Sequence, residues 1–211
     1  MVRRSHLLRS LLTLAVGGVL TSSVLAADAW PAKPIRLVVP YPPGGSSDII
    51  ARSIGQLISQ ELKQTVVIDN KPGANGNLGA EFVARAPADG YTWLLCDLGA
   101  LAISPSIYTK LSFDPSKAMR GAAMLAYSPH MLVVHPSVQA SNLKELVELS
   151  KKQDLNFAVT ASGSAPHLAG VELARITGAK WVYVPYKGGV QSVQDTVAGQ
   201  TQVLMNGMLA T

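Results

Sequence analysis

Residues 35–62 read IRLVVPYPPGGSSDIIARSIGQLISQEL, and this stretch decides the fold of the chain. Its first five residues, 35–39, form a short apolar and β-branched run, which predicts a strand buried on both faces. Two prolines and two glycines then end the strand, because proline lacks the donor that a central strand needs and glycine supplies unusual backbone angles. Apolar residues return at helical spacing from Ile50 onward, so a helix is expected to begin near Ser46 or Ser47.

The loop between this strand and this helix is a candidate anion site. A helix that starts directly after a glycine loop leaves backbone N–H groups unpaired, and such groups attract an anion. The helix dipole contributes only about 0.3–1 kcal/mol when exposed, so several amides and hydroxyls must converge for useful affinity. The loop is neither a P-loop, since no Lys-Ser or Lys-Thr follows the glycines, nor G-x-G-x-x-G. An ordinary strand-to-helix turn explains the glycines equally well.

The rest of the chain alternates short strands with helices. Further strands are expected at 65–68, 91–96, 131–135, 156–160, 181–184 and 202–205. The order strand, helix, strand predicts a parallel sheet with right-handed crossovers, and ligands then lie at the carboxyl ends of the strands. Residues 122–129 carry no strong helix pattern, so we place the crossing between two α/β lobes there. The lobes are expected to comprise residues 27–125 and 126–211.

A second loop of small residues, ASGSA at 161–165, follows the strand at 156–160 and precedes a helix that Pro166 can begin at its first position. The argument for anion binding is the same as for the first loop. If the two lobes face each other, two helix N-termini converge on one cleft. Two such loops in different lobes are more specific than either loop alone.

The first 26 residues have the features of a secretory signal peptide. Three arginines precede an apolar core from Leu11 to Leu20, and small residues lead to a cleavage site that we place after Ala26. The apolar run is too short to span a bilayer. We therefore expect an exported protein.

The charge of the chain lies mostly in this segment. The whole sequence has 18 Lys and Arg against 13 Asp and Glu, and removing three arginines leaves 15 against 13, a net charge of +2. No basic cluster interleaved with aromatic residues remains, which argues against a nucleic-acid partner. The single cysteine, Cys96, cannot form an internal disulfide and is expected to be a small buried residue at the end of a strand. The histidines lack metal-ligand spacing, so neither a metal nor a cofactor is expected.

Five motifs occur in order along the chain: PIRLVVPYPPGGSSD at 34–48, NKPGANGNLGA at 70–80, DGY at 89–91, HLAG at 167–170 and VPYKG at 184–188. Together they resemble the Bug solute receptors, the periplasmic subunits of tripartite tricarboxylate transporters. The resemblance implies an α/β, two-lobed periplasmic-binding-protein fold of type II, with a mainly parallel sheet flanked by helices in each lobe. It also implies that the protein captures a small organic acid and delivers it to the membrane permease subunits, as a monomer when complete.

The resemblance assigns the ligand carboxylate to two loops, the one after the first strand and the one before the HLAG helix, partly through water. The residues expected to line the site are Tyr41, Pro43, Gly44, Gly45, Ser46, Ser47, Asp48, Leu98, Thr160, Ser162, Gly163, Ser164, His167, Tyr186, Lys187 and Asn206. For His167 the alternative is a residue that packs and bonds locally at a helix start. Tyr186 and Lys187 are candidates to close over the ligand. For Lys187 the alternative is a charged loop residue exposed to solvent.

Three positions depart from the family pattern. Residues 96–98, Cys-Asp-Leu, stand where a glycine and small polar residues are common, and Asn206 stands where Asp is usual. Residues 165–166, Ala-Pro, stand where hydroxyl residues are common. Asp97 would repel a second carboxylate of a ligand unless it is paired, so these departures leave the identity of the acid open.

Two other functions remain open at this point. One is a periplasmic receptor for a different anion. The other is a serine hydrolase with Ser46 or Ser47 as nucleophile and His167 as base, although the chain has no Gly-x-Ser-x-Gly elbow.

The chain also stops at Thr211, a few residues past an apolar strand. The resemblance implies that roughly the last third of a full receptor is missing. Such a loss leaves unpaired strand edges and an uncovered apolar face, so a product of this length is expected to bind weakly or not at all and to be poorly soluble.

Overall fold

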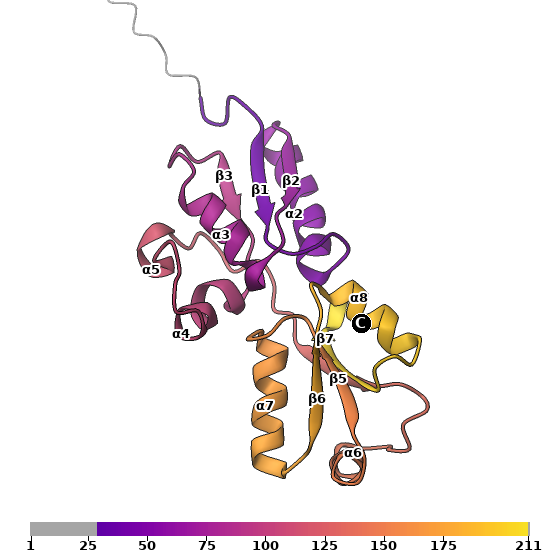
Figure 1. Ribbon diagram of the computed structural model, residues 1–211. Coiled ribbons are helices and arrows are strands. Elements are labelled where there is room, and N and C mark those ends of the chain that lie inside the picture. The colour runs from indigo at the N-terminus through magenta and orange to yellow at the C-terminus, as the bar shows by residue number, and fades with distance from the viewer. Residues whose placement is uncertain (1–28, 211) are drawn as a thin grey trace, which may run out of the picture. The chain divides into compact units, whose positions relative to one another are not determined.

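The computed structural model describes residues 29–210 (Figure 1). The helices and strands described below belong to one compact unit that begins at Lys33. The predicted signal peptide at residues 1–26 lies outside the described residues. Within the described part, every helix is too short or too polar to cross a membrane.

The first sheet is parallel and has the strand order β2-β1-β3. Its strands are β1 (Ile35–Val39), β2 (Val66–Asn70) and β3 (Thr92–Leu94), connected through the helices α2 (Ser46–Leu62) and α3 (Asn77–Ala84). Strand β1 lies in the centre, and Ile35, Val38 and Val39 are completely buried. The parallel sheet predicted from the alternation of strands and helices is therefore confirmed, as is the burial of the first strand.

Strand β3 is shorter than the sequence predicts. It ends at Leu94, so Cys96 follows the strand instead of ending it, and Cys96 is only partly buried. The chain then forms a π-helical turn (Gly99–Ile103) and two short helices, α4 (Ser104–Ile107) and α5 (Pro115–Ala118). These elements are too short to show a helical period in the sequence, which is why the pattern did not predict them.

The second sheet is mixed and has the order β4-β7-β5-β6. Its strands are β4 (His130–Val134), β5 (Leu155–Val159), β6 (Trp181–Pro185) and β7 (Val203–Gly207), with α6 (Leu143–Ser150), α7 (Ala165–Thr177), α8 (Gly189–Val197) and the 3-10 turn η3 (Met208–Ala210). Strand β5 runs parallel to β6 and β7, whereas β4 pairs antiparallel with β7. The sheet is thus mainly parallel, as predicted, with one antiparallel edge.

The core of this sheet is built around Phe157, which is completely buried. Its ring lies 5.5 Å from the ring of Trp181 and 5.5 Å from the ring of Tyr183, centroid to centroid, in tilted arrangements that aromatic pairs prefer. Side chains cap the start of α6, since Asn142 Oδ1 accepts from the N–H of Glu145 at 3.0 Å and Glu145 Oε2 accepts from the N–H of Ser141 at 2.7 Å.

The segment 119–129 links α5 to β4 without helix or strand, and most of it is exposed. The two sheets come from residues 35–94 and 130–207, on either side of this segment in the sequence. We keep the division into lobes at residues 125 and 126 as a proposal.

Helix α3 approaches the end of β1 closely at Gly79. A Cβ at this position would lie 2.7 Å from Pro40 Cβ, 2.9 Å from Pro40 Cα and 3.0 Å from the carbonyl oxygen of Lys71. Backbone atoms and a proline ring cannot turn aside as a flexible side chain can. Only glycine fits at position 79, because any side chain would push α3 away from the sheet.

We expect Gly79→Ala to lower the free energy of unfolding by about 1–3 kcal/mol, the usual range for overpacking. Gly121→Ala is the matched control, because nothing lies within 4 Å of a Cβ there, and it should change stability by less than about 0.5 kcal/mol. Urea denaturation of both variants measures the difference. Equal stability of the two would show that α3 can move away from β1 without cost.

Candidate ligand-binding site

Helix α2 begins without a side-chain cap. Its N-cap is Gly45, with φ −77° and ψ 170°, and not Ser46 or Ser47 as the sequence predicts. The serines are instead the first two residues of the helix. Because the first N–H groups of an α-helix have no partner within the helix, this start presents backbone donors to a ligand.

The glycine loop before α2 is held in place by the buried carboxylate of Asp48, which is 3% exposed. Its Oδ2 accepts from the N–H of Gly44 at 2.9 Å and from Arg52 Nε at 2.9 Å, and its Oδ1 accepts from Asn70 Nδ2 at 3.0 Å. Asn70 Nδ2 also donates to the carbonyl of Tyr41 at 3.1 Å. Asp48 and Asn70 therefore fix both ends of the loop.

These bonds decide the charge state of Asp48. Burial pushes the pKa of its carboxyl group upward, but the hydrogen bonds from Arg52, Gly44 and Asn70 outweigh burial and hold the pKa below its ordinary value. The group is therefore ionised at neutral pH. Its negative charge is compensated by these donors, so Asp48 serves the loop and not a ligand in this structure.

The start of α8 lies against the same loop. A Cβ at Gly188 would be 2.7 Å from Pro42 Cγ, and a Cβ at Gly44 would be 3.3 Å from Val190 Cγ2. Gly188 is the N-cap of α8, and no side chain caps this helix either. Two uncapped helix N-termini therefore adjoin, whereas the sequence pattern predicted the loop at 161–165 as the partner of the first loop.

A hollow of about 190 Å³ opens at this junction, lined by Pro42, Lys187, Gly188, Gly189, Val190, Gln191 and Gln194. Among the predicted site residues only Lys187 lines it. The Gly-Gly pair after Lys187 is the feature of the sequence that could have predicted it, because it repeats the arrangement of glycines before a helix.

Two buried hydroxyl groups near this junction, Ser46 Oγ and Ser128 Oγ, lack a hydrogen-bond partner among the described residues. A Cβ at Gly207, at the end of β7, would lie 2.7 Å from Ser46 Oγ and 3.6 Å from Ser128 Oγ. Both hydroxyl groups therefore lie next to Gly207. Ser128 lies in the segment without regular structure, where no periodicity draws attention to it.

Asn206 joins the end of β7 to the start of α8. It is 4% exposed, its Nδ2 donates to the carbonyl of Gly189 at 3.3 Å, and its Oδ1 accepts from the N–H of Gly207 at 2.8 Å. An Asp at this position could not donate to the carbonyl, so the amide suits this contact.

The second predicted loop uses its donors internally. Ser164 Oγ accepts from the N–H of His167 at 3.4 Å and donates to the carbonyl of Ala161 at 2.8 Å. The N–H of Gly163 donates to His167 Nδ1 at 2.9 Å. Ser164 is the N-cap of α7, so Pro166 is the second helical residue and not the first.

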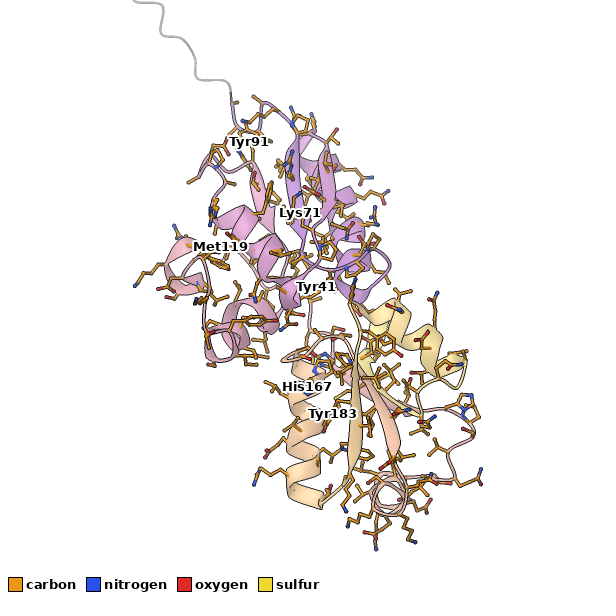
Figure 2. All side chains as sticks on the ribbon, viewed as in Figure 1. Tyr41, Lys71, Tyr91, Met119, His167 and Tyr183 are labelled. Carbon is orange, nitrogen blue, oxygen red and sulfur yellow. The ribbon has the colours of Figure 1, made fainter. Side chains whose placement is uncertain are left out.

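His167 has the local role that was one of its two predicted alternatives. Its ring meets Tyr183 edge-on, with 4.9 Å between ring centroids (Figure 2). Because Nδ1 accepts a hydrogen bond, the neutral ring carries its proton on Nε2. Asn75 Nδ2 donates to the carbonyl of Gly163 at 3.3 Å, which ties the second loop to the end of the loop after β2.

Other predicted residues are more scattered. The hydroxyl of Tyr186 donates to Asp195 Oδ2 at 2.9 Å and is therefore engaged with α8. Pro43, Leu98 and Ser162 are exposed, and Thr160, directly after β5, is half-buried. Contact of these residues with a ligand stays a prediction.

Tyr41, at the carboxyl end of β1 (Figure 2), is paired with Asp97. Its hydroxyl donates to Asp97 Oδ1 at 2.6 Å, and the same oxygen accepts from the N–H of Gly99 at 2.7 Å. Burial and then the charge of Asp97 raise the pKa of Tyr41, so the phenol keeps its proton. The same two causes raise the pKa of Cys96 to about 11, which makes its thiol a poor nucleophile at neutral pH.

Within residues 29–210 no group of His, Cys, Asp and Glu side chains is arranged to hold a metal ion. The hydrolase arrangement also lacks support from the contacts that the described side chains make. His167 bonds to the loop before its own helix, and Asp48 bonds to Arg52, Asn70 and Gly44.

Comparison with known proteins identifies the family. Residues 50–211 match the family described as tripartite tricarboxylate transporter family receptor. The chain belongs to this receptor family. The family consists of binding proteins and not of enzymes, which removes the hydrolase alternative.

Individual relatives of the receptor extend the comparison. The chain is 33% identical over 211 residues to a UPF0065 protein of Bordetella bronchiseptica, with 98% of this chain and 63% of the relative covered. An R. palustris protein solved with adipate is 31% identical, with a TM-score of 0.82 over 85% of this chain and 60% of the other. MatC from Rhodopseudomonas palustris, with bound malate, is 29% identical, with a TM-score of 0.78 over 84% and 61%. The chain thus spans about three fifths of the length of these relatives.

The Asp48 network predicts a dependence of stability on pH. A carboxyl group with a lowered pKa in the folded chain stabilises the fold above its unfolded pKa, about 3.9, and this contribution is lost as the pH falls through the folded value. In Asp48→Asn an NH₂ group, itself a donor, replaces one of the oxygens that accept from Gly44, Arg52 and Asn70. We expect it to lower the free energy of unfolding by about 1–3 kcal/mol at pH 7.

The difference between Asp48→Asn and the wild type should shrink below about pH 4, as the wild-type carboxyl group becomes protonated. Urea denaturation between pH 7 and pH 3 measures it, and Asp154→Asn, at an exposed aspartate, serves as the control. A difference that is constant across this range would show that the charge of Asp48 does not stabilise the loop.

Proposed function

We propose that this protein is an extracytoplasmic solute receptor that binds a small organic carboxylate. The observation that carries the proposal is the junction of two uncapped helix N-termini, α2 and α8, beside a hollow of about 190 Å³. Backbone donors and the positive ends of two helix dipoles favour an anion at this point. A carboxylate oxygen, directly or through one water, would also satisfy the buried hydroxyls of Ser46 and Ser128.

The proposed site works without an arginine clamp. The loops at 41–48, 160–167 and 186–190 contain no arginine, and Lys187 is the only lysine in them. Affinity would therefore come mainly from neutral dipoles and hydroxyls. Such a site distinguishes anions by shape and by the number of donors rather than by charge.

The nature of the relatives supports a carboxylate. Two structurally similar proteins were solved with adipate and with malate, both of which are dicarboxylates. The predicted signal peptide at residues 1–26 supports a periplasmic location, and the family description supports delivery of the ligand to a transporter's membrane subunits. A receptor for another anion is the second candidate, because helix N-termini also bind phosphate.

Gly45→Val tests the site. A Cβ at Gly45 would have Pro42 O, at 3.8 Å, as its nearest neighbour, and the backbone angle φ of −77° suits any residue, so the variant should fold. The valine methyl groups would cover the donors at the start of α2. We expect the stabilisation of the wild type by an organic acid in a thermal-shift screen to be lost in this variant.

The control is Gly121→Val, at a position open on all sides, which should respond to acids as the wild type does. Inorganic phosphate is included in the same screen. Survival of acid binding in a folded Gly45→Val variant would refute the site. Tight binding of phosphate without response to any carboxylate would favour the second candidate.

Ser128→Ala separates binding from folding. Removing a buried hydroxyl without a partner should leave the free energy of unfolding unchanged or raise it by up to about 1 kcal/mol. If the hydroxyl serves the ligand, affinity for the acid should fall about tenfold, which corresponds to about 1.4 kcal/mol. Calorimetric titration and urea denaturation measure the two effects. An unchanged affinity would exclude Ser128 from the site.

A further inference from the structure

Resting on the proposed function, we infer that Asp97 makes the site select an organic acid that also carries a cationic nitrogen, an amino acid or a related amino carboxylate, over a dicarboxylate. The acid group would bind at the helix N-termini. The cationic group would pair with the carboxylate of Asp97.

Only one of the two oxygens of the Asp97 carboxylate accepts hydrogen bonds. Its Oδ1 accepts from the hydroxyl of Tyr41 at 2.6 Å and from the N–H of Gly99 at 2.7 Å. Within residues 29–210, Oδ2 receives no hydrogen bond and no lysine, arginine or histidine lies within 4.0 Å of the group. The residue is exposed. One oxygen thus orients the group, and the other is available to a ligand.

Asp97 also lies beside Tyr41, which precedes the start of α2 at the site. A Cβ at Gly99 would be 2.9 Å from Asp97 Oδ1 and 3.4 Å from both Tyr41 Oη and Asn75 Nδ2. Tyr41 starts the loop that leads into α2, and Asn75 donates to the carbonyl of Gly163 in the loop that leads into α7. The bond to Tyr41 places the carboxylate at the start of the loop that precedes α2, one of the two helices whose N-termini form the candidate site.

The negative charge of Asp97 also acts on His130, the first residue of β4 in the second sheet. Burial lowers the pKa of His130, and the negative charge of Asp97 opposes this effect. His130 pairs with Gly207, the residue beside the buried hydroxyls of Ser46 and Ser128. A ligand bound at the helix N-termini would therefore lie within the field of this carboxylate.

A negative charge that no cation compensates discriminates between ligands. It attracts an ammonium group and repels the second carboxylate of a dicarboxylate, and like charges brought together cost enough to reject a wrong partner. The similar proteins solved with adipate and malate hold dicarboxylates. The selectivity inferred here would set this chain apart from them.

Asp97→Asn tests the inference cleanly, because Asn Oδ1 can still accept from Tyr41 and Gly99 while the charge is removed. The ligands are matched sets of equal carbon number, 4-aminobutyrate with succinate and butyrate, and alanine with malonate and propionate, together with a panel of α-amino acids. Asp89→Asn, an exposed aspartate before β3, controls for a general change of charge.

Calorimetric titration should show the wild type binding at least one amino carboxylate ten or more times more tightly than the matched dicarboxylate. Asp97→Asn should lose at least tenfold in affinity for the amino carboxylate and bind the dicarboxylate more tightly, whereas Asp89→Asn should keep the wild-type order. A wild type that prefers dicarboxylates, or an order unchanged in Asp97→Asn, would overturn this inference and leave the receptor function intact. A wild type that binds no acid in any set would overturn the proposed function and the inference with it.

Discussion

The buried carboxylate of Asp48 is the constraint on which the candidate site depends. A charge taken out of water is tolerated only when donors surround it, and here the donors come from the glycine loop, from α2 and from the end of β2. The same bonds that satisfy the charge give the loop one conformation. The donors at the start of α2 are thereby fixed before any ligand arrives, which lowers the ordering cost of binding.

Much of the fold follows from local patterns in the sequence. The apolar run at 35–39 predicted a buried strand, and the prolines and glycines at 42–45 predicted its end, because both patterns depend on neighbouring residues only. The antiparallel pairing of β4 with β7 depends instead on residues about seventy positions apart. The short helices α4 and α5 contain too few residues to show a period.

The candidate site was predicted only in part, for a related reason. Gly45 and Ser46 stand out because glycines and serines precede a periodic helix, and the structure places both at the start of α2. The loop at 161–165 has the same composition, yet His167 and Ala161 occupy its donors and acceptors. Ser128 and the start of α8 join the site through tertiary contacts. Whether a polar group is used internally or left for a ligand is a property of the packed molecule, which composition does not reveal.

The conformation of the glycine loop before α2 depends on the register in which β1 pairs with β2. Val39 lies opposite Asn70 in the parallel register, and the side chain of Asn70 reaches Asp48 and the carbonyl of Tyr41. A shift of β2 by one residue would turn Asn70 to the other face of the sheet and release the loop. Only correctly registered molecules would then bind, so a ligand present during refolding would draw the population toward the native register by mass action.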